Sequence, residues 1–338
     1  MSVLRRLAAI ATSLPGRIVI SAGLLAIVAL SIDWADVTDR LSDASWGLFA
    51  LATLLLISNI SLAALRWQLL LNGAGLHPLL RASLRAYWIG LFANNLLPTG
   101  FGGDAVRAWL VAPKGAPLAR ALTSVIVDRA TAFGVLLPIA WLGAAIGGDE
   151  IPGTIVLLLA IVTAVSAAGA LVAVVLLRRR GLGRFLPAAM RPWAAEVAST
   201  LRRYGSERER MAEVVFLAVA FQFLMIAATW VLSESLGLDI GPELIAVVLP
   251  LVLFATIIPI SIAGFGVREG AFVALLGEAG VSSADAVLLS LATVASLAIA
   301  SLPGGVLMMV RHERIESAEE IFEEAGSPDE GASLPREA

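Results

Sequence analysis

The sequence predicts an all-α, polytopic membrane protein with six transmembrane helices and two oppositely oriented re-entrant hairpins that form an inverted repeat. The composition, the lengths of the apolar runs and two similar interrupted segments support this fold class. Of the 338 residues, 59% are hydrophobic and 15% are charged, whereas a soluble domain is about half apolar and about a quarter charged. The composition therefore favours a membrane protein over a soluble catalytic domain.

Apolar runs predict the spans, because crossing a hydrocarbon core about 30 Å thick takes roughly 20 apolar helical residues. Six runs approach this length: 18–33, 46–65, 119–147, 152–177, 211–236 and 284–310. Pro, Gly and charged residues interrupt two further apolar stretches, 84–112 and 244–278. We expect the first run to be a retained span, because no small-x-small cleavage site follows it.

Basic residues set the expected orientation, since Lys and Arg accumulate in cytoplasmic loops. They cluster at alternate ends of the spans, whereas acidic residues dominate the opposite loops. Both termini are therefore expected in the cytoplasm, with the protein in the cell (inner) membrane. The charges agree with this topology only if 84–112 enters and returns on the cytoplasmic side and 244–278 on the outer side. The same topology predicts Trp67 at the inner membrane interface.

One membrane domain is expected over residues 1–312. Its cytoplasmic linker, 178–210, is rich in arginine and is expected to contain a helix on the membrane surface. The tail 313–338 is acidic and contains Gly, Ser and Pro, so we expect it to be disordered in the cytoplasm.

The two interrupted stretches resemble each other. Residues 96–107 and 257–269 both contain an apolar pair, a proline, a short gap, Gly-Phe-Gly and an arginine, which is Arg107 or Arg268. Similar hairpins in opposite orientations are typical of secondary transporters that bind substrate at broken helices. A helix that restarts after Gly-Phe-Gly directs free N–H groups and partial positive charge at the break. The repeat therefore predicts two anion sites that face each other.

Ionisable residues in apolar segments are the second indication of a site, since each costs at least about 2.5–3.5 kcal/mol at mid-bilayer. Six lie there: Asp104, Arg107, Asp128, Arg129, Arg268 and Glu269. They could pair with one another and fix the hairpins to the following spans. Alternatively, Arg107 and Arg268 bind a phosphate through their planar donor forks, while the carboxylates orient them, receive an ammonium group or carry a coupling proton.

The predicted substrate site adds small and amide residues at the breaks to these six ionisable ones. These are Gly102, Gly103, Gly264, Gly266, Asn94 and Asn95. The chain has no cysteine, and its two histidines are not in a metal-ligand spacing. No nucleophile–base pair and no Walker-type phosphate loop is apparent. We therefore expect no enzyme activity, no metal, no cofactor and no nucleic-acid partner.

Several motifs in this order resemble the lysylphosphatidylglycerol synthase transmembrane, or flippase-like, family. They are Arg66-Trp67-Gln68-Leu69-Leu70, Asn94-Asn95-Leu96-Leu97-Pro98, Gly102-Gly103-Asp104-Ala105-Val106-Arg107, Asp128-Arg129, and Pro259 with Gly264-Phe265-Gly266-Val267-Arg268-Glu269-Gly270. The resemblance covers roughly residues 15–312 and implies a lipid translocase fold with two re-entrant hairpins. Where family members often carry Glu before the arginine of the third span, this chain has Asp128.

In bifunctional members of that family, the membrane part moves an aminoacylated phosphatidylglycerol made by an attached cytosolic aminoacyltransferase domain. No segment of domain size lies outside the membrane part here, so the resemblance leaves the lipid open. We expect a translocase that moves a phospholipid or other phosphate-bearing lipid between leaflets through a polar groove between the hairpins. The alternatives are an ion-coupled carrier of a small anion and a non-transporting envelope-biogenesis scaffold. A homo-oligomer is compatible with each of them.

Overall fold

All the regular structure in the described part of the chain is helical. The computed structural model describes residues 14–30, 34–96, 102–112, 118–178, 191–257, 261 and 264–309. The helices are α2 (Leu14–Leu30), α3 (Trp34–Ser42), α4 (Trp46–Gly73), α5 (Leu80–Leu96), α6 (Gly102–Val111), α7 (Leu118–Gly147), the 3-10 helix η1 (Gly148–Glu150), α8 (Gly153–Arg178), α9 (Arg191–Ser206), α10 (Arg208–Ser235), α11 (Pro242–Ile257), α12 (Val267–Glu278) and α13 (Ser283–Met309). The all-α prediction is confirmed. The predicted tail 313–338 lies outside the described residues.

Five of the described helices are long and apolar enough to cross a membrane, namely α4, α7, α8, α10 and α13. They match five of the six predicted runs. An apolar run predicts a helix well because the backbone polar groups of a segment in lipid must form their hydrogen bonds within that segment. The described part of α2 has 17 residues, and the predicted run 18–33 extends beyond it into residues that are not described. The chain is therefore a multi-pass membrane protein.

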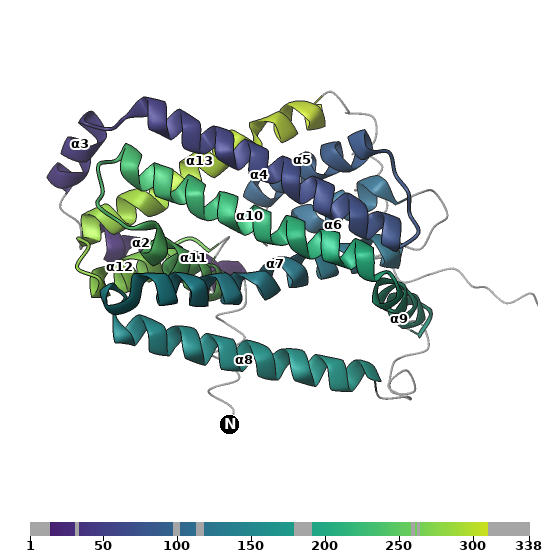
Figure 1. The fold of residues 1–338 in the computed structure, drawn as a ribbon. Helices are drawn as coiled ribbons and strands as arrows, with labels where there is room; N and C mark the ends of the chain where they lie inside the picture. Colours follow the sequence, from purple (N-terminus) through teal and green to yellow (C-terminus); the bar gives the residue numbers. More distant parts are fainter. Residues whose placement is uncertain are drawn as a thin grey trace, which may run out of the picture.

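The long helices form a bundle whose centre is the pair α4 and α10. These two helices pack along each other, and α7 and α13 both contact them (Figure 1). The helix α8 lies at the edge of the bundle and is the least buried of the five spans. Its apolar surface is suited to lipid contact, since a bundle in hydrocarbon has no need to cover such a surface.

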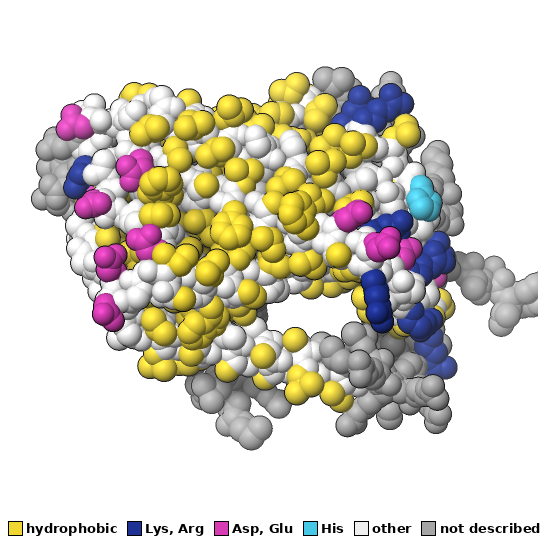
Figure 2. Space-filling view, in the orientation of Figure 1, with side chains coloured by type: hydrophobic (Ala, Val, Ile, Leu, Met, Phe, Trp, Pro, Cys, Tyr) yellow, Lys and Arg dark blue, Asp and Glu magenta, His cyan; other side chains and the backbone are white. Residues whose placement is uncertain are grey.

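Charged side chains gather at the two ends of the bundle. Figure 2 shows a hydrophobic middle, a group of acidic side chains at the end that carries α3, and most of the visible basic side chains at the end that carries α9. The concentration of basic side chains at one end is the pattern expected for helices that cross a bilayer with their basic loops on one side.

Both interrupted stretches are pairs of helices rather than continuous spans. In the first helix pair, α5 ends at Leu96 and α6 begins at Gly102; in the second, α11 ends at Ile257 and α12 begins at Val267. The two members of each pair pack against each other. Figure 1 places the first helix pair toward the α9 end of the bundle and the second toward the α3 end.

Backbone contact between glycines holds the first helix pair together. A Cβ placed on Gly103 would lie 1.8 Å from the carbonyl oxygen of Gly90 on the facing helix, so no larger residue fits there. The Gly103 N–H also donates to Asn94 Oδ1 at 2.8 Å, which gives the start of α6 a hydrogen-bond partner. On the other side of α5, Gly304 of α13 lies against the Trp88 carbonyl group. The first helix pair is therefore fixed to the bundle by close helix approach.

The linker helix α9 packs across the ends of α4 and α7. The Tyr204 hydroxyl donates to the Leu70 carbonyl oxygen at 2.8 Å, and Arg120 forms an ion pair with Glu196. Burial raises the pKa of the Tyr204 phenol, which therefore remains a donor at neutral pH. The helix predicted within the linker is thus attached to the bundle.

We expect Gly103→Ala to destabilise the protein, because the added methyl group would overlap the Gly90 carbonyl oxygen. Overpacking of this kind costs at least about 1–3 kcal/mol. Gly134→Ala on α7 is the matched control, since a Cβ there meets nothing within 4 Å. Thermal unfolding of the purified protein in detergent should show a lower midpoint for Gly103→Ala alone. Equal midpoints for the two variants would contradict the close contact.

A buried arginine–aspartate cluster as the candidate functional site

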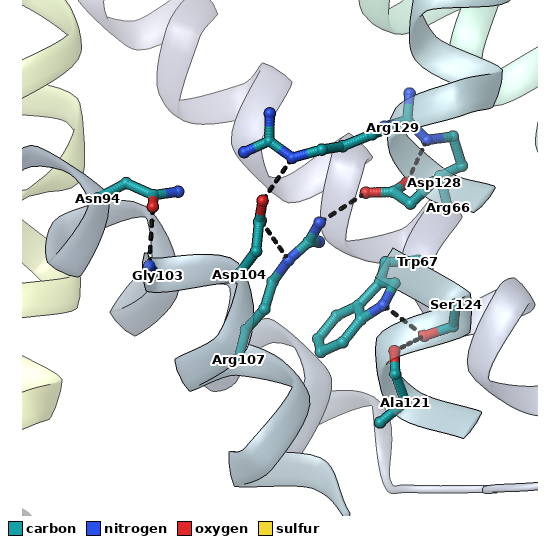
Figure 3. A network of polar contacts seen from close by, with 10 residues as sticks. All are labelled: Arg66, Trp67, Asn94, Gly103, Asp104, Arg107, Ala121, Ser124, Asp128 and Arg129. Atoms are coloured by element: carbon teal, nitrogen blue, oxygen red, sulfur yellow. Dashed lines mark hydrogen bonds and ion pairs between the residues drawn. The ribbon is translucent and has the colours of Figure 1, made fainter. Parts of the chain in front are cut away.

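Five charged side chains from three helices meet inside the bundle (Figure 3). This arginine–aspartate cluster consists of Arg66 from α4, Asp104 and Arg107 from α6, and Asp128 and Arg129 from α7. Asp104 and Arg107 are three residues apart, which puts them on one face of α6. The five residues of the cluster thus come from only three short segments of the sequence.

The cluster alternates in charge from one end to the other. Arg66 Nε lies 2.7 Å from Asp128 Oδ1, and the other oxygen of Asp128 lies 3.1 Å from Arg107 Nη2. Arg107 Nε then lies 3.1 Å from Asp104 Oδ1, and Arg129 pairs with the second Asp104 oxygen. Three arginines and two aspartates leave the cluster with one net positive charge.

Exposure rises along this chain of charges. The side chains of Arg66 and Asp128 are each 2% exposed and that of Arg107 is 4% exposed, whereas Arg129 is 35% exposed. Removing ions from water costs several kcal/mol each unless good pairing compensates. The alternating pairs provide this compensation at the buried end, and Arg129 marks the end that reaches the surface.

Aromatic rings enclose the two buried guanidinium groups. The Arg107 guanidinium carbon lies 4.7 Å from the Trp67 ring centroid and 4.5 Å from that of Tyr87. Arg66 stacks on Phe221 at 5.0 Å. Contacts of this kind favour the cation without neutralising its charge.

Trp67 is buried inside the bundle rather than exposed on its surface, as a residue of an aromatic belt would be. Trp67 is fully buried, and its Nε1 donates to Ser124 Oγ at 3.0 Å (Figure 3). The helix α4 continues to Gly73, well beyond the predicted end of this span at residue 65. Both Arg66 and Trp67 therefore lie within the helix rather than in a loop.

A cavity of about 210 Å³ adjoins the cluster. Its walls come from the first helix pair and from α4, α7, α10 and α11; Leu253 represents the second helix pair. On the α10 side, Gln222 Nε2 donates to the Ala132 carbonyl oxygen at 2.9 Å and so fixes α10 to α7. The buried Nη1 atoms of Arg66 and Arg107 have no hydrogen-bond partner among the described atoms. The cavity thus combines a net positive charge with two unused donors, and suits an anionic group with several oxygen atoms.

The second helix pair holds a separate charge pair. Arg268 Nε lies 3.3 Å from Glu269 Oε1, and the Arg268 guanidinium stacks on Phe265. Gly264 and Gly266 have φ of +83° and +82°, a conformation that glycine adopts most easily. Neither Arg268 nor Glu269 lines the cavity of the arginine–aspartate cluster. The two predicted anion sites therefore do not share this cavity.

The structure brings together five of the predicted site residues at the cavity: Asn94, Asp104, Arg107, Asp128 and Arg129. Gly102 begins α6, and Gly103 contacts Asn94. Asn95 is directed elsewhere, because its Nδ2 donates to Ser301 Oγ at 2.9 Å. Among the described side chains, no group of three or more His, Asp or Glu could hold a metal ion.

Sequence reasoning missed several cavity residues: Arg66, Tyr87, Phe221 and Gln222. A signal existed for Arg66 alone, because the apolar pattern of the second run resumes at Leu69–Leu71 and places the arginine inside a helix. The aromatic and amide residues carry no charge, so hydropathy does not distinguish them from ordinary packing residues.

We predict that Asp128→Asn strongly destabilises the protein, because it leaves Arg66 and Arg107 without their shared counter-ion. Losing one partner of a buried ion pair costs about 3–5 kcal/mol. Thermal unfolding in detergent would measure the loss, and Arg66→Met combined with Asp128→Leu should recover part of it. Glu207→Gln is the control, since its ion pair with Arg210 is partly exposed and should contribute little. Wild-type stability of Asp128→Asn would show that the cluster does not hold the bundle together.

Comparison with known proteins identifies the family of the chain. The chain is 25% identical over 320 residues to a UPF0104 membrane protein of Methanothermobacter thermautotrophicus (strain Delta H), with 85% of this chain and 95% of the relative covered. A sequence profile described as the lysylphosphatidylglycerol synthase TM region matches residues 16–306, a range that contains both helix pairs and the whole arginine–aspartate cluster. The chain belongs to the lysylphosphatidylglycerol synthase TM region family.

Proposed function

We propose that this protein is a lipid translocase that moves a phosphate-bearing head group between leaflets while the acyl chains stay in the hydrocarbon. The arginine–aspartate cluster carries the proposal. It is a net positive group inside a membrane bundle, it borders a cavity, and two of its buried guanidinium groups each have an unused donor. Such charges are costly in a membrane and usually mark the path of a substrate or ion.

Charge balance favours a phosphodiester as the ligand. A phosphodiester bears one negative charge, which would neutralise the single net positive charge of the cluster. Its two free oxygens can accept the unused N–H groups of Arg66 and Arg107 in the bidentate manner of guanidinium–phosphate pairs. A phosphate monoester, with a charge of about −1.5 to −2, would leave excess negative charge in a low-dielectric site. A head group that also carries an ammonium could place it near Asp104, which lies toward the exposed end of the cluster.

The two helix pairs, toward opposite ends of the bundle, provide the path between leaflets in this proposal. The cavity is bordered by the first helix pair and by Leu253, near the end of the first helix in the second pair. Rearrangement at such breaks exposes a fixed site alternately in many transporters. The chain carries no ATP-binding motif, so transport would be downhill or ion-coupled. We regard the chain as a transporter rather than an enzyme.

This function implies the full predicted topology: six spans that include α2, two re-entrant helix pairs, and both termini on the cytoplasmic side of the cell membrane. The concentration of basic side chains at the α9 end supports it, as does the location of the helix pairs toward opposite ends of the bundle.

Single-cysteine labelling tests this topology, because the chain has no cysteine of its own. Arg85→Cys lies in the second turn of α5 and Ala112→Cys directly follows α6, and both should react with an impermeant maleimide from the cytoplasmic side. Asp239→Cys and Ser282→Cys flank the second helix pair, and both should react from the outer side. If the members of either pair react from opposite sides, that segment crosses the membrane and the re-entrant arrangement is wrong.

Transport itself can be measured in proteoliposomes that contain phosphatidylglycerol labelled on one acyl chain with a dithionite-sensitive fluorophore. Wild-type protein should move labelled lipid between leaflets. Arg66→Ala and Arg107→Ala should each reduce this rate to that of protein-free vesicles, because they remove the phosphate donors. Arg268→Ala should do the same if the second helix pair also contacts the phosphate. Arg85→Ala is the matched control, since this exposed arginine lies on α5 outside the cavity.

Several outcomes would reject the proposal. Wild-type rates in Arg66→Ala and Arg107→Ala would eliminate the phosphate site. Uptake of radiolabelled phosphate without dependence on lipid composition would favour a small-anion carrier. Tolerance of neutralising substitutions throughout the arginine–aspartate cluster would favour a non-transporting scaffold.

A further inference from the structure

The two helix pairs differ in the group that occupies the N-terminus of their second helix. In the first pair, the Gly103 N–H donates to Asn94 Oδ1, which is neutral. In the second pair, the Gly266 N–H donates to Glu269 Oε2 at 2.6 Å, so a carboxylate occupies the N-terminus of α12. Glu269 is the third residue of α12, and its side chain reaches back to Gly266, the residue that precedes the helix, as in a capping box.

Glu269 also occupies the position at Arg268 that an incoming anion would need. The residue is 1% exposed, and its Oε1 lies 3.3 Å from Arg268 Nε and 3.4 Å from Ser290 Oγ. Arg268 Nη2 is buried and has no hydrogen-bond partner among the described atoms. Arg268 and Glu269 together are neutral, in contrast to the net positive arginine–aspartate cluster. A phosphate that used the spare Arg268 donor would therefore lie beside a buried carboxylate.

Two adjacent anions in a site of low dielectric repel each other strongly, and one of them normally takes up a proton. We propose that Glu269 binds one proton when a phosphate-bearing head group binds Arg268, so that one proton accompanies each lipid through the second helix pair. This inference rests on the proposed function. The proton comes from water and is bound to Glu269 Oε1. The resulting O–H group can donate a hydrogen bond to Ser290 Oγ. Glu269 Oε2 continues to accept the Gly266 N–H, so the start of α12 remains intact.

The helices around α12 contain few charged residues. The helix α12 packs against α2, α8, α11 and α13. These four helices contain one charged residue each, at or near an end: Arg17, Arg178, Glu243 and Asp285. Asp285 already pairs with Arg40, and Ser21, Leu24 and Leu25 of α2 lie against Gly266. Arg268 is thus the charged side chain with a described contact to Glu269.

Linkage fixes the direction of the pH effect. If anion binding increases the affinity of Glu269 for a proton, then protonation must increase the affinity for the anion by the same factor. Affinity for the lipid should consequently rise as the pH falls, by up to about tenfold per pH unit when one proton is taken up.

Calorimetric titration of the full-length protein in detergent with dihexanoyl phosphatidylglycerol tests the inference. Repeating it at one pH in buffers of different ionisation enthalpy gives the number of protons taken up per lipid bound. We expect about one proton for each lipid bound at Arg268 in wild type. Glu269→Gln should still bind the lipid but take up no proton, and Arg268→Ala, which keeps only the arginine–aspartate cluster, should also bind without proton uptake. Glu278→Gln should behave like wild type, because this carboxylate is exposed at the far end of the same helix and accepts from Thr154. Phosphate-free dihexanoylglycerol should cause no proton uptake.

The outcomes separate this inference from the proposed function. If wild type binds more lipid than Arg268→Ala and still takes up no proton, then the coupling is wrong and the translocase proposal stands. Proton uptake that persists in Glu269→Gln overturns the assignment to Glu269. If wild type fails to bind the lipid, or Arg107→Ala binds it equally well, the phosphate site itself is wrong. The wild-type buffer series decides the coupling even if Glu269→Gln does not fold.

Discussion

The arrangement of the candidate site depends on the two ion pairs of the Asp128 carboxylate. Its two oxygens pair with Arg66 on α4 and Arg107 on α6, while Asp128 itself belongs to α7. One carboxylate therefore joins three helices in a region where an unpaired ion would be costly. Because both arginines share this counter-ion, neither is fully neutralised. The same contact that positions the first helix pair leaves positive charge available at the cavity.

The helices were largely predictable from sequence because lipid imposes a simple rule on the backbone. A span must satisfy its own hydrogen bonds over about 20 apolar residues, so hydropathy alone predicted 119–147 for a helix observed at Leu118–Gly147. Arg66 and Trp67 show where this rule fails. An arginine after an apolar run was interpreted as the start of a cytoplasmic loop, but its partner Asp128 is 62 residues away in sequence. Hydropathy contains no information about such a pairing.

The difference between the two helix pairs was present in the sequence but was hidden by their similarity. Both contain Gly-Phe-Gly and an arginine, which suggested two equivalent anion sites. The acidic neighbour, however, precedes Arg107 by three residues and follows Arg268 by one. A separation of three puts Asp104 on the same helix face as Arg107. Glu269 lies instead where its side chain can return to the start of its own helix. An arginine and a nearby acidic residue thus produce a cluster that borders a cavity in the first pair. In the second pair, the acidic residue caps its own helix.

A single electrostatic constraint then accounts for both sites. Charge buried in a bilayer is tolerated when each occupied state is close to neutral. The arginine–aspartate cluster carries one excess positive charge, so an arriving phosphodiester makes it neutral without any proton. Arg268 and Glu269 are neutral before anything arrives, so a phosphodiester there would create an excess negative charge unless a proton came with it. In the first helix pair, the negative charge of the head group would therefore be neutralised by the excess arginine. In the second helix pair, it would be neutralised by a proton. Such an exchange would give a membrane protein without an ATP-binding motif a direct way to draw on a proton gradient.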